Sequence, residues 1–285
     1  MSELDLRTAA ASAAPARRAR PGVGELLALG FVLFLLAATI VPGLISPFEP
    51  NAISARDAFQ PPSLTHWFGT DESGRDIYSR VVAGTSTSLL IGVSATAIGL
   101  VLGLALGILA GFGGRVLDFT VNRTIEVLFA FPGLLLALLV IVIAGPGPVT
   151  ATIAVGLSTA PGYARIIRGQ LVSIRTSAYV ESARVLGHGP FRILTRHILP
   201  NALAPLLVLA TLGIGQAVVW AAALSYLGLG AQPPAAEWGA MLSAGRTYIG
   251  TAWWLTVFPG LMIVLTTIAT TVLGRSLTRR TAGNR

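Results

Sequence analysis

One serine in the sequence stands in a pattern that could support nucleophilic chemistry. The run GLSTA around Ser158 has the small-residue spacing found around serine nucleophiles. Such a serine needs a base within hydrogen-bonding distance, but the three histidines lie outside the apolar segments, in predicted loops: His66, His188 and His197. We therefore expect the small residues around Ser158 to allow close helix packing. An intramembrane serine hydrolase is the alternative, and it predicts that a serine-reactive probe labels Ser158.

Two residue types that carry much enzyme chemistry are absent from the sequence. All 20 basic residues are arginine, and there is no cysteine. Without lysine there is no Walker A phosphate loop, no Schiff base and no Ser-Lys dyad. Without cysteine there is no disulfide, no thiolate metal ligand and no thiol nucleophile. The sequence therefore excludes several large classes of enzyme.

An acidic cluster raises the question of a calcium site. Asp71, Glu72 and Asp76 lie close together in a segment rich in proline and glycine, with Arg75 between them. The order of acidic ligands and glycine that an EF-hand requires is not present. Asp and Ser often cap turns in such segments, and Arg75 can balance the carboxylates. We expect a structured turn here and no metal site.

The composition indicates that membrane helices hold these residues in place. Hydrophobic residues make up 53% of the 285 residues, charged residues make up 11%, and the mean hydropathy is +0.74. Soluble domains contain about 25% charged residues. The net charge of +8 does not indicate a nucleic-acid partner, because the arginines flank apolar segments without interleaved aromatic residues.

Six apolar segments come close to the ~20 residues that a membrane-spanning helix needs, so the sequence predicts an all-α membrane protein. The first segment reaches this length, which favours a retained helix over a cleaved signal peptide. Polar residues and a Pro-Gly pair interrupt the fourth segment. The six segments are Leu26–Ile45, Leu89–Ala110, Glu126–Ala144, Thr150–Ile167, Ala202–Leu227 and Ala252–Leu273.

The arginines predict the orientation of these helices. Sixteen of the 20 fall on the side of the N-terminus, and the other four are Arg56, Arg75, Arg80 and Arg246. Because arginine-rich segments stay in the cytoplasm, both termini are expected there. The predicted organisation is a disordered cytoplasmic tail (1–22), a first helix with an extracytoplasmic loop (23–84), a core transmembrane domain (85–277) and a cytoplasmic tail (278–285).

The predicted spans contain almost no ionisable residue, which disfavours an ion-coupled carrier. Their polar residues could line a hydrophilic passage or form hydrogen bonds between helices, and the sequence leaves both open. Candidates for the passage are Thr211, Gln216 and Ser225. The energy source would then be a partner, and the cytoplasmic segment 177–200 is elaborate enough to receive one.

The segment 177–200 is polar and basic, and it lies between long apolar segments. Ser177 can cap a short helix over Ala178–Leu186, and Gly187 can end it. A second helix is expected over Pro190–Pro200, because proline suits the first helical position and forces an end at the other side. The sequence therefore predicts two short amphipathic helices joined by a tight turn.

The spacing in this segment resembles the EAA loop of the membrane subunits of binding-protein-dependent ABC importers. Glu181-Ser-Ala183, then Gly187, then the ending His-Ile-Leu-Pro200 follow that pattern, with Ser182 in place of the usual alanine. Five further runs resemble the C-type permease subunit of the dipeptide, oligopeptide and nickel branch: HWFGTDESGRDIYSR, AFPGLLL, PGYARII, SYLGLGAQPP and WGAMLSAGRTY. The resemblance covers about residues 24–277, and the C-terminus lacks the acidic residues that members of this branch often carry.

The resemblance implies the type I ABC importer (MetI-like) permease fold, with six transmembrane helices and cytoplasmic coupling helices between the fourth and the fifth. It implies a non-enzymatic subunit of the bacterial inner membrane that forms half of the pathway for dipeptides, oligopeptides or a related solute. The implied partners are a homologous second permease, two ATPase subunits that bind the ATP and Mg²⁺, and an external solute-binding protein. The resemblance assigns ATPase docking to the following residues: Glu181, Ser182, Ala183, Arg184, Gly187 and His188.

The sequence leaves open the role of the acidic loop, the transported solute and the class of transporter. Asp71, Arg75 and Asp76 are candidates for contact with the binding protein, although a purely structural turn is an equal alternative. An importer of nickel or another small solute is the alternative within the family, because selection rests largely with the external binding protein. A self-contained channel or secondary carrier is the alternative from another class.

Overall fold

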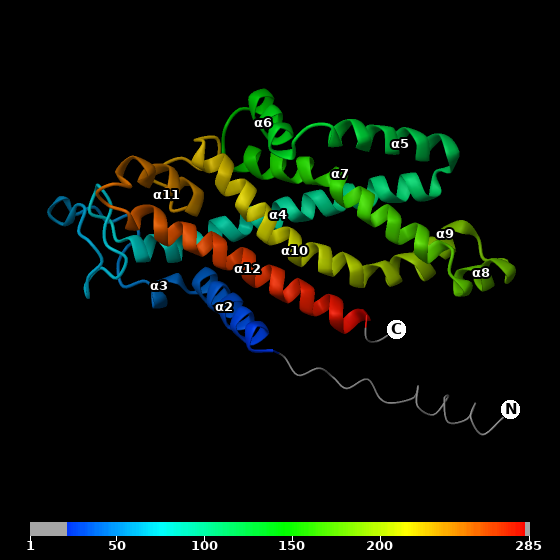
Figure 1. Cartoon of the computed structure of the whole chain (residues 1–285), viewed down its shortest axis with the longest axis horizontal. Helices are drawn as coiled ribbons and strands as arrows, with labels where there is room; N and C mark the ends of the chain where they lie inside the picture. The colour runs from blue at the N-terminus through cyan, green and yellow to red at the C-terminus, as the bar shows by residue number, and fades with distance from the viewer. Residues whose placement is uncertain (1–21, 283–285) are drawn as a thin grey trace, which may run out of the picture.

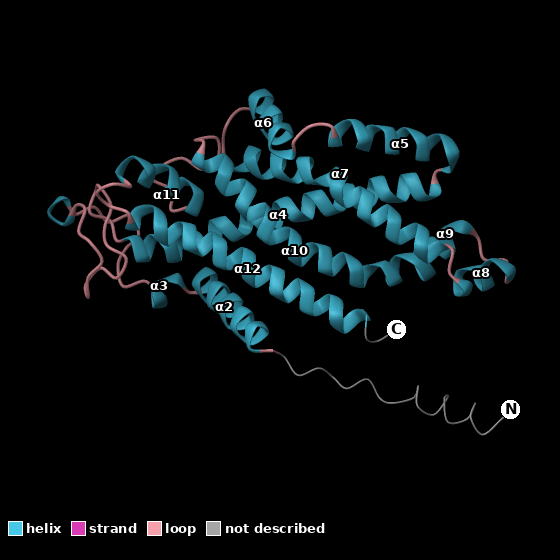
Figure 2. Ribbon diagram, in the orientation of Figure 1, coloured by secondary structure: helices cyan, strands magenta, loops and turns pink. Residues whose placement is uncertain are grey.

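The computed structural model describes residues 22–282, and this part of the chain is helical, without a β-strand (Figure 2). The tail expected over 1–22 lies outside the described residues, except for Gly22. Long helices run along one axis of the molecule (Figure 1). One end carries α11 (Trp238–Gly245) and the loop that precedes α4, and the opposite end carries α8 (Ala178–Val185) and α9 (Pro190–Ile193).

The long axis is formed mainly by four helices, which are α4 (Ile77–Phe112), α7 (Pro148–Arg175), α10 (Leu199–Tyr226) and α12 (Trp254–Ala282). The other elements are α2 (Val23–Ile40), α3 (Pro42–Ile45), α5 (Gly114–Phe129), α6 (Gly133–Ala144), the π-helical turn η2 (Leu194–Ile198), and the 3₁₀ turns η1 (Ala55–Asp57) and η3 (Arg246–Tyr248). At 1.5 Å per residue, α4 is about 54 Å long, which exceeds the ~30 Å hydrocarbon core of a bilayer.

Four helices in the described residues are long and apolar enough to cross a membrane, and they are α2, α4, the Pro205–Tyr226 part of α10 and the Trp254–Arg279 part of α12. The bent pair α5 and α6 would make a fifth. Helix α7 has 28 residues but is more polar, and it does not meet the same criteria of length and composition. The structure thus confirms several apolar helices, whereas the count of six stays a prediction.

The core of the helix bundle depends on small residues of α4. The most extensive helix pair in the chain is α4 with α7. Gly99, Gly103 and Gly107 recur every four residues of α4, and each lies against α7. A Cβ atom at Gly103 would stand 2.6 Å from the Tyr163 Cβ and 2.9 Å from the Ala164 backbone nitrogen. Helices in membranes pack closely where such small residues meet, so these glycines set the distance between α4 and α7.

The predicted third span, Glu126–Ala144, is broken. Helix α5 ends at Phe129, α6 begins at Gly133, and the two helices are bent by 92°. Pro132 explains the break, because it has no N–H to donate and disfavours helical angles at the preceding residue. The C-terminal boundary also differs, since α12 continues to Ala282, five residues into the range expected as a tail.

Candidate functional site

The first arm of the connection between α7 and α10 matches the prediction closely. Helix α8 spans Ala178–Val185, one residue shorter than expected. Its Val180 and Ala183 side chains are buried in a cluster with residues of α7, η2 and α10, among them Leu171 and Ile198. The Ser177 side chain does not cap the helix as predicted, because its hydroxyl donates to the Ile174 carbonyl at 2.6 Å. Helix α8 is therefore held by its buried face and not by its N-terminal serine.

Gly187 ends α8 in the way the sequence predicts. Its φ angle is +77°, in the left-handed region that favours glycine. The Gly187 N–H donates to the Arg184 carbonyl at 2.9 Å, and the His188 N–H donates to the Ala183 carbonyl at 3.1 Å. These two bonds are the pair that defines a Schellman C-cap. The turn at Gly187 is thus a specific hydrogen-bonded structure that reverses the chain after α8.

The second arm differs from the prediction. Helix α9 covers only Pro190–Ile193, the π-helical turn η2 follows it, and α10 begins at Leu199. Pro200 was expected to end a helix, but it lies in the first turn of α10, where proline is tolerated. The wider π turn accommodates the proline ring and its missing donor, since the Leu199 N–H reaches back to the Leu194 carbonyl. The second arm therefore continues into α10 without a break in the helical path.

Arginine side chains link α8 to the neighbouring helices. The Arg184 Nη1 lies 3.2 Å from the Glu181 Oε2, and the Arg184 Nη2 donates to the Arg175 carbonyl at the end of α7. Arg175 in turn donates to the Gly111 carbonyl of α4 at 2.6 Å, and its guanidinium lies over the Phe112 ring. An exposed ion pair contributes less than about 1 kcal/mol. These contacts matter mainly because Arg184 joins α8 to the end of α7, and Arg175 joins α7 to the end of α4.

Apolar side chains at the end of the connection are exposed. Val185, Leu186 and Phe191 have exposed fractions of 83%, 75% and 77%. They lie on either side of the Gly187 turn, and we call these three residues the apolar tip. Single exposed apolar residues are common, but three around one turn indicate a contact surface.

Two histidines stack beside the apolar tip. The His188 and His197 rings have centroids 5.5 Å apart, and their planes differ by 28°. The His188 Nδ1 and the His197 Nε2 are buried atoms with no hydrogen-bond partner in the described part of the chain. Desolvation of the His188 ring, with the positive charges of Arg192 and Arg196 and the adjacent His197, lowers the pKa of His188. These effects all disfavour the protonated form of His188.

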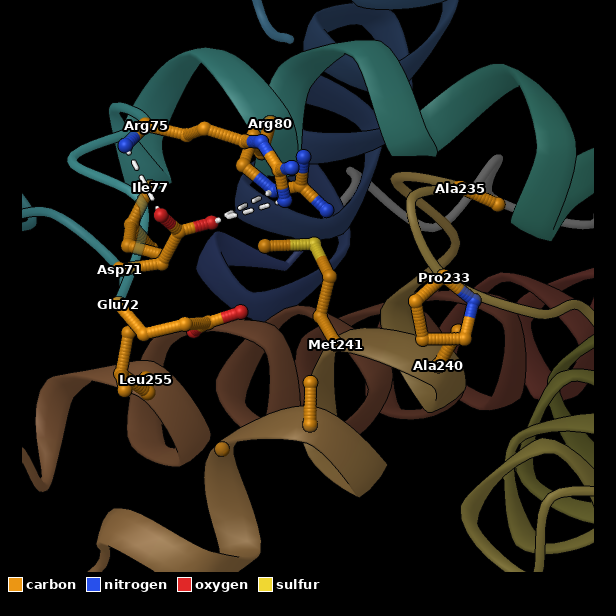
Figure 3. Close-up of a pocket in the computed structure, with 12 residues that line it drawn as sticks. Asp71, Glu72, Arg75, Ile77, Arg80, Pro233, Ala235, Ala240, Met241 and Leu255 are labelled. Carbon is orange, nitrogen blue, oxygen red and sulfur yellow. Dashed lines mark hydrogen bonds and ion pairs between the residues drawn. The ribbon is translucent and has the colours of Figure 1, made fainter. Parts of the chain in front are cut away.

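The acidic cluster in the loop that precedes α4 forms an internal network (Figure 3). The Asp71 Oδ1 accepts from the Ser73 and Arg75 backbone N–H groups, and its Oδ2 lies 3.6 Å from Arg75 Nη1 and 3.8 Å from Arg80 Nε. Arg80 also donates to the Asn51 Oδ1 and to the Pro234 carbonyl, so it joins two loops that are distant in the sequence. This is the structured turn that the sequence predicts, and no group of three metal-ligating side chains occurs within residues 22–282.

Asp76 has a structural position in this network. Its Oδ2 accepts from the Ser79 N–H at 2.8 Å and caps α4, and its Oδ1 lies 2.9 Å from the His66 Nδ1. The side chains of Asp71 and Asp76 are only 7% and 2% exposed. A binding-protein contact of Asp71, Arg75 and Asp76 stays a prediction. In the structure these side chains bond to groups of the same loop and to the start of α4.

Glu237 is an important buried residue that sequence reasoning misses. Its exposed fraction is 2%, and it caps α11 by accepting from the Gly239 N–H at 2.8 Å and the Ala240 N–H at 2.9 Å. Burial raises the pKa of the Glu237 carboxyl, and hydrogen bonds from the Gly239 and Ala240 N–H groups and from the Ser225 and Ser88 hydroxyls oppose the shift. The sequence gives little indication that Glu237 caps a helix, because the usual N-cap residues are Ser, Thr, Asp and Asn and not Glu.

We expect Glu237→Gln to destabilise the end of the molecule that carries α11 by about 1 kcal/mol, because an amide has one acceptor for the two N–H groups that the carboxylate satisfies. The pKa of Glu237 is raised by folding, so its contribution to stability is fully present below the unfolded-state pKa and declines as the pH rises through the folded-state value. Thermal melting of detergent-solubilised protein between about pH 4 and pH 8 measures both effects. The decline should be absent in the variant, and identical melting curves at every pH would contradict this assignment.

The three candidates for the passage do not lie together. Gln216 lines an open cavity between the α5–α6 break, α7 and α10. Ser225 is 2% exposed and lies beside Glu237, away from that cavity. The Thr211 hydroxyl donates to the Leu207 carbonyl of its own helix at 2.9 Å. Their role in a passage is untested, and the structure separates Gln216 from the other two.

The fold resembles that of chains in two solved ABC transporter structures. The chain superposes on the methionine transporter MetNI in an inward-facing conformation with a TM-score of 0.58 at 24% identity, covering 70% of this chain and 95% of that one. A crystal structure of an amino acid ABC transporter gives a TM-score of 0.56 at 18% identity, covering 70% and 94%. At this level of identity the similarity defines the fold alone.

The sequence then defines the family. Residues 103–283 match the family described as the binding-protein-dependent transport system inner membrane component, and the chain belongs to this family. It is 40% identical to the dipeptide transport system permease protein DppC of Alkalihalophilus pseudofirmus, over 90% of this chain and 83% of that one. It is also 40% identical to the glutathione transport system permease protein GsiD of Pectobacterium atrosepticum, over 87% and 82% of the two chains. The probable D,D-dipeptide transport system permease protein DdpC of Escherichia coli is 40% identical, over 85% and 81%.

Proposed function

We propose that the chain is the permease subunit of an ATP-driven importer of short peptides. The observation that carries this proposal is the 40% identity, over most of both chains, to permeases named for the transport of dipeptides, D,D-dipeptides and glutathione. All three solutes are short peptides. A nickel complex or another small solute is the alternative within the family.

The α8–α9 connection supports the proposal, because one side of it is buried and the other exposes apolar side chains that a partner could cover. Its inner face is buried against α7 and α10, whereas the apolar tip at Val185, Leu186 and Phe191 is exposed. We assign ATPase docking to this tip together with the predicted set Glu181, Ser182, Ala183, Arg184, Gly187 and His188. Glu181 and Arg184 are exposed and form an ion pair with each other, which a partner could extend by further charge-assisted contacts, while buried Ala183 lets α8 lie close to the bundle.

Motion of the docked ATPase would reach the membrane helices through existing contacts. Arg184 connects α8 to the end of α7, Arg175 connects α7 to α4, and η2 connects the second arm directly to α10. A partner can shift the conformation of these helices only if it binds the two conformations differently. The expected partners are therefore two ATPase subunits that bind ATP and Mg²⁺, a second homologous permease and an external solute-binding protein.

In this proposal the chain crosses the membrane six times, with both termini in the cytoplasm. The four apolar helices and the bent α5–α6 pair supply five crossings. Helix α7 is the sixth, and its polar residues are tolerable in a membrane if they face a passage or another helix. This orientation places α8 and α9 in the cytoplasm, where an ATPase can reach them.

Copurification tests the proposal. An affinity tag on this chain should bring down an ATP-hydrolysing protein and a second permease after mild detergent extraction of native membranes. The matched control is the same chain with Leu186→Asp in the apolar tip, which should lose the ATPase but keep the second permease. Isolation of the chain alone, in a form that transports solute without ATP, would support a self-contained channel or carrier instead.

A further inference from the structure

The break between α5 and α6 opens onto a cavity of about 340 Å³. Aromatic and aliphatic side chains, with glycine and proline, provide most of its lining, and Ser158, Thr159, Gln216 and the hydroxyl-bearing Tyr163 also lie on it. The Trp220 ring packs so closely on Gly133 that a Cβ atom there would collide with it. The volume falls within the ~300–1,000 Å³ that is usual for sites of small ligands.

The polar groups of this cavity are available to a ligand. Within residues 22–282, the Gln216 amide forms no hydrogen bond with the chain. The Ser158 and Thr159 hydroxyls donate to carbonyls of their own helix, at 2.9 Å and 3.0 Å to Val155, and their oxygens can still accept. The cavity lining contains no Asp, Glu, Arg or His.

Membrane physics excludes lipid as the occupant of this surface. The Ala130 and Phe131 N–H groups donate to carbonyls of α5 and Pro132 has no N–H, but the side-chain amide of Gln216 has no hydrogen-bond partner within residues 22–282. Unsatisfied polar groups cost several kcal/mol in hydrocarbon, so irregular backbone at membrane depth occurs where it lines a water-filled cavity or is covered by protein. The cavity must therefore face water, a solute or the second permease.

We propose that this cavity is a substrate site that receives an uncharged side chain of the transported peptide, with the Gln216 amide pairing to the adjacent peptide bond. The inference rests on the proposed peptide transport. A primary amide has both a donor and an acceptor, which matches a peptide bond. The apolar lining suits an apolar side chain, and because no ionised group lines the cavity, the charged ends of the peptide bind elsewhere.

Cysteine labelling tests this site, because the chain itself has no cysteine. Gln216→Cys and Ser158→Cys are introduced singly into the whole importer with cysteine-free partners, reconstituted in vesicles. A membrane-impermeant thiol reagent should modify both about tenfold or more faster than a control, Ile268→Cys, since a thiol in water ionises and reacts more readily than one in lipid. Ile268 is an exposed apolar residue of α12.

Substrate protection completes the test. Dileucine delivered by the binding protein should slow labelling of Gln216→Cys several-fold, dialanine should slow it less, and neither should affect Ile268→Cys. Labelling at the control rate, or without any effect of dileucine, would overturn the inference and would place this surface against the second permease. Peptide uptake by the unmodified importer is measured in the same vesicles, so failure of peptide transport itself is recognised separately.

Discussion

Replacement of Gly187 by valine is expected to reduce the stimulation of ATP hydrolysis by solute-loaded binding protein about tenfold. A side chain at φ +77° costs about 1–2 kcal/mol, which corresponds to roughly a factor of ten in docking affinity when the native turn is required. The amount of inserted subunit should remain near that of the unsubstituted protein. No atom lies within 4 Å of the position of a Gly187 Cβ, and the buried face of α8 is untouched.

Gly189 provides the matched control for this experiment. It lies two residues further on, it also has no atom within 4 Å of a Cβ position, and its φ of −66° is available to any residue. Gly189→Val should therefore keep the stimulation, and Glu181→Lys should lose it because the exposed acidic contact is reversed. Full stimulation in Gly187→Val, measured in reconstituted vesicles, would show that the Schellman turn has no part in coupling.

Replacement of Gly103 by alanine is expected to reduce the stability of the folded subunit. The added methyl group would lie 2.6 Å from the Tyr163 Cβ and 2.9 Å from the Ala164 nitrogen, in the most extensive helix pair. Overpacking of this kind costs about 1–3 kcal/mol, which exceeds the ~1 kcal/mol gain in helix propensity from replacing glycine by alanine. We expect a lower melting temperature in detergent and a reduced yield of folded subunit.

The control for packing is Gly111→Ala, near the end of the same helix. Gly111 has no atom within 4 Å of a Cβ position, so only the gain in helix propensity should remain. The two substitutions are chemically identical, and their effects on the melting temperature should have opposite signs. Equal melting temperatures for the two variants would mean that α4 and α7 do not approach as closely as described.

Local rules predict the helix and the turn in the first arm of the α8–α9 connection. The end of α8 at Gly187 follows from the conformational freedom of a single residue, but helix periodicity read as a face of Tyr179, Ala183 and Leu186 is wrong about the buried side, because Val180 and Ala183 are buried while Tyr179 and Leu186 are exposed. The second arm is not predictable in this way. Whether Pro200 ends a helix or begins one depends on the π turn at Leu194–Ile198, which tertiary packing of Ile193 and Ile198 stabilises.

The break at Pro132 illustrates a different difficulty. The apolar run from Leu134 to Ala144 reads as the end of a membrane span, and proline alone does not reveal a bend of 92°. The sequence also does not distinguish the polar residues that line a cavity from those that support other side chains. Gln216 lines the cavity but Ser225 supports Glu237, because these two residues face different neighbours around α10. The sequence shows which residues of a helix are polar. Whether each one lines a cavity or supports another side chain depends on the neighbouring helices that pack around it.

The most direct measurement of the central claim is peptide uptake by vesicles that contain this chain with its second permease and ATPase subunits. Radiolabelled dipeptide should accumulate only when ATP is present on the ATPase side and the loaded binding protein is present on the other. Omission of any one component, including this chain, should abolish accumulation. Uptake by this chain alone, without ATP and without the ATPase subunits, would contradict the account.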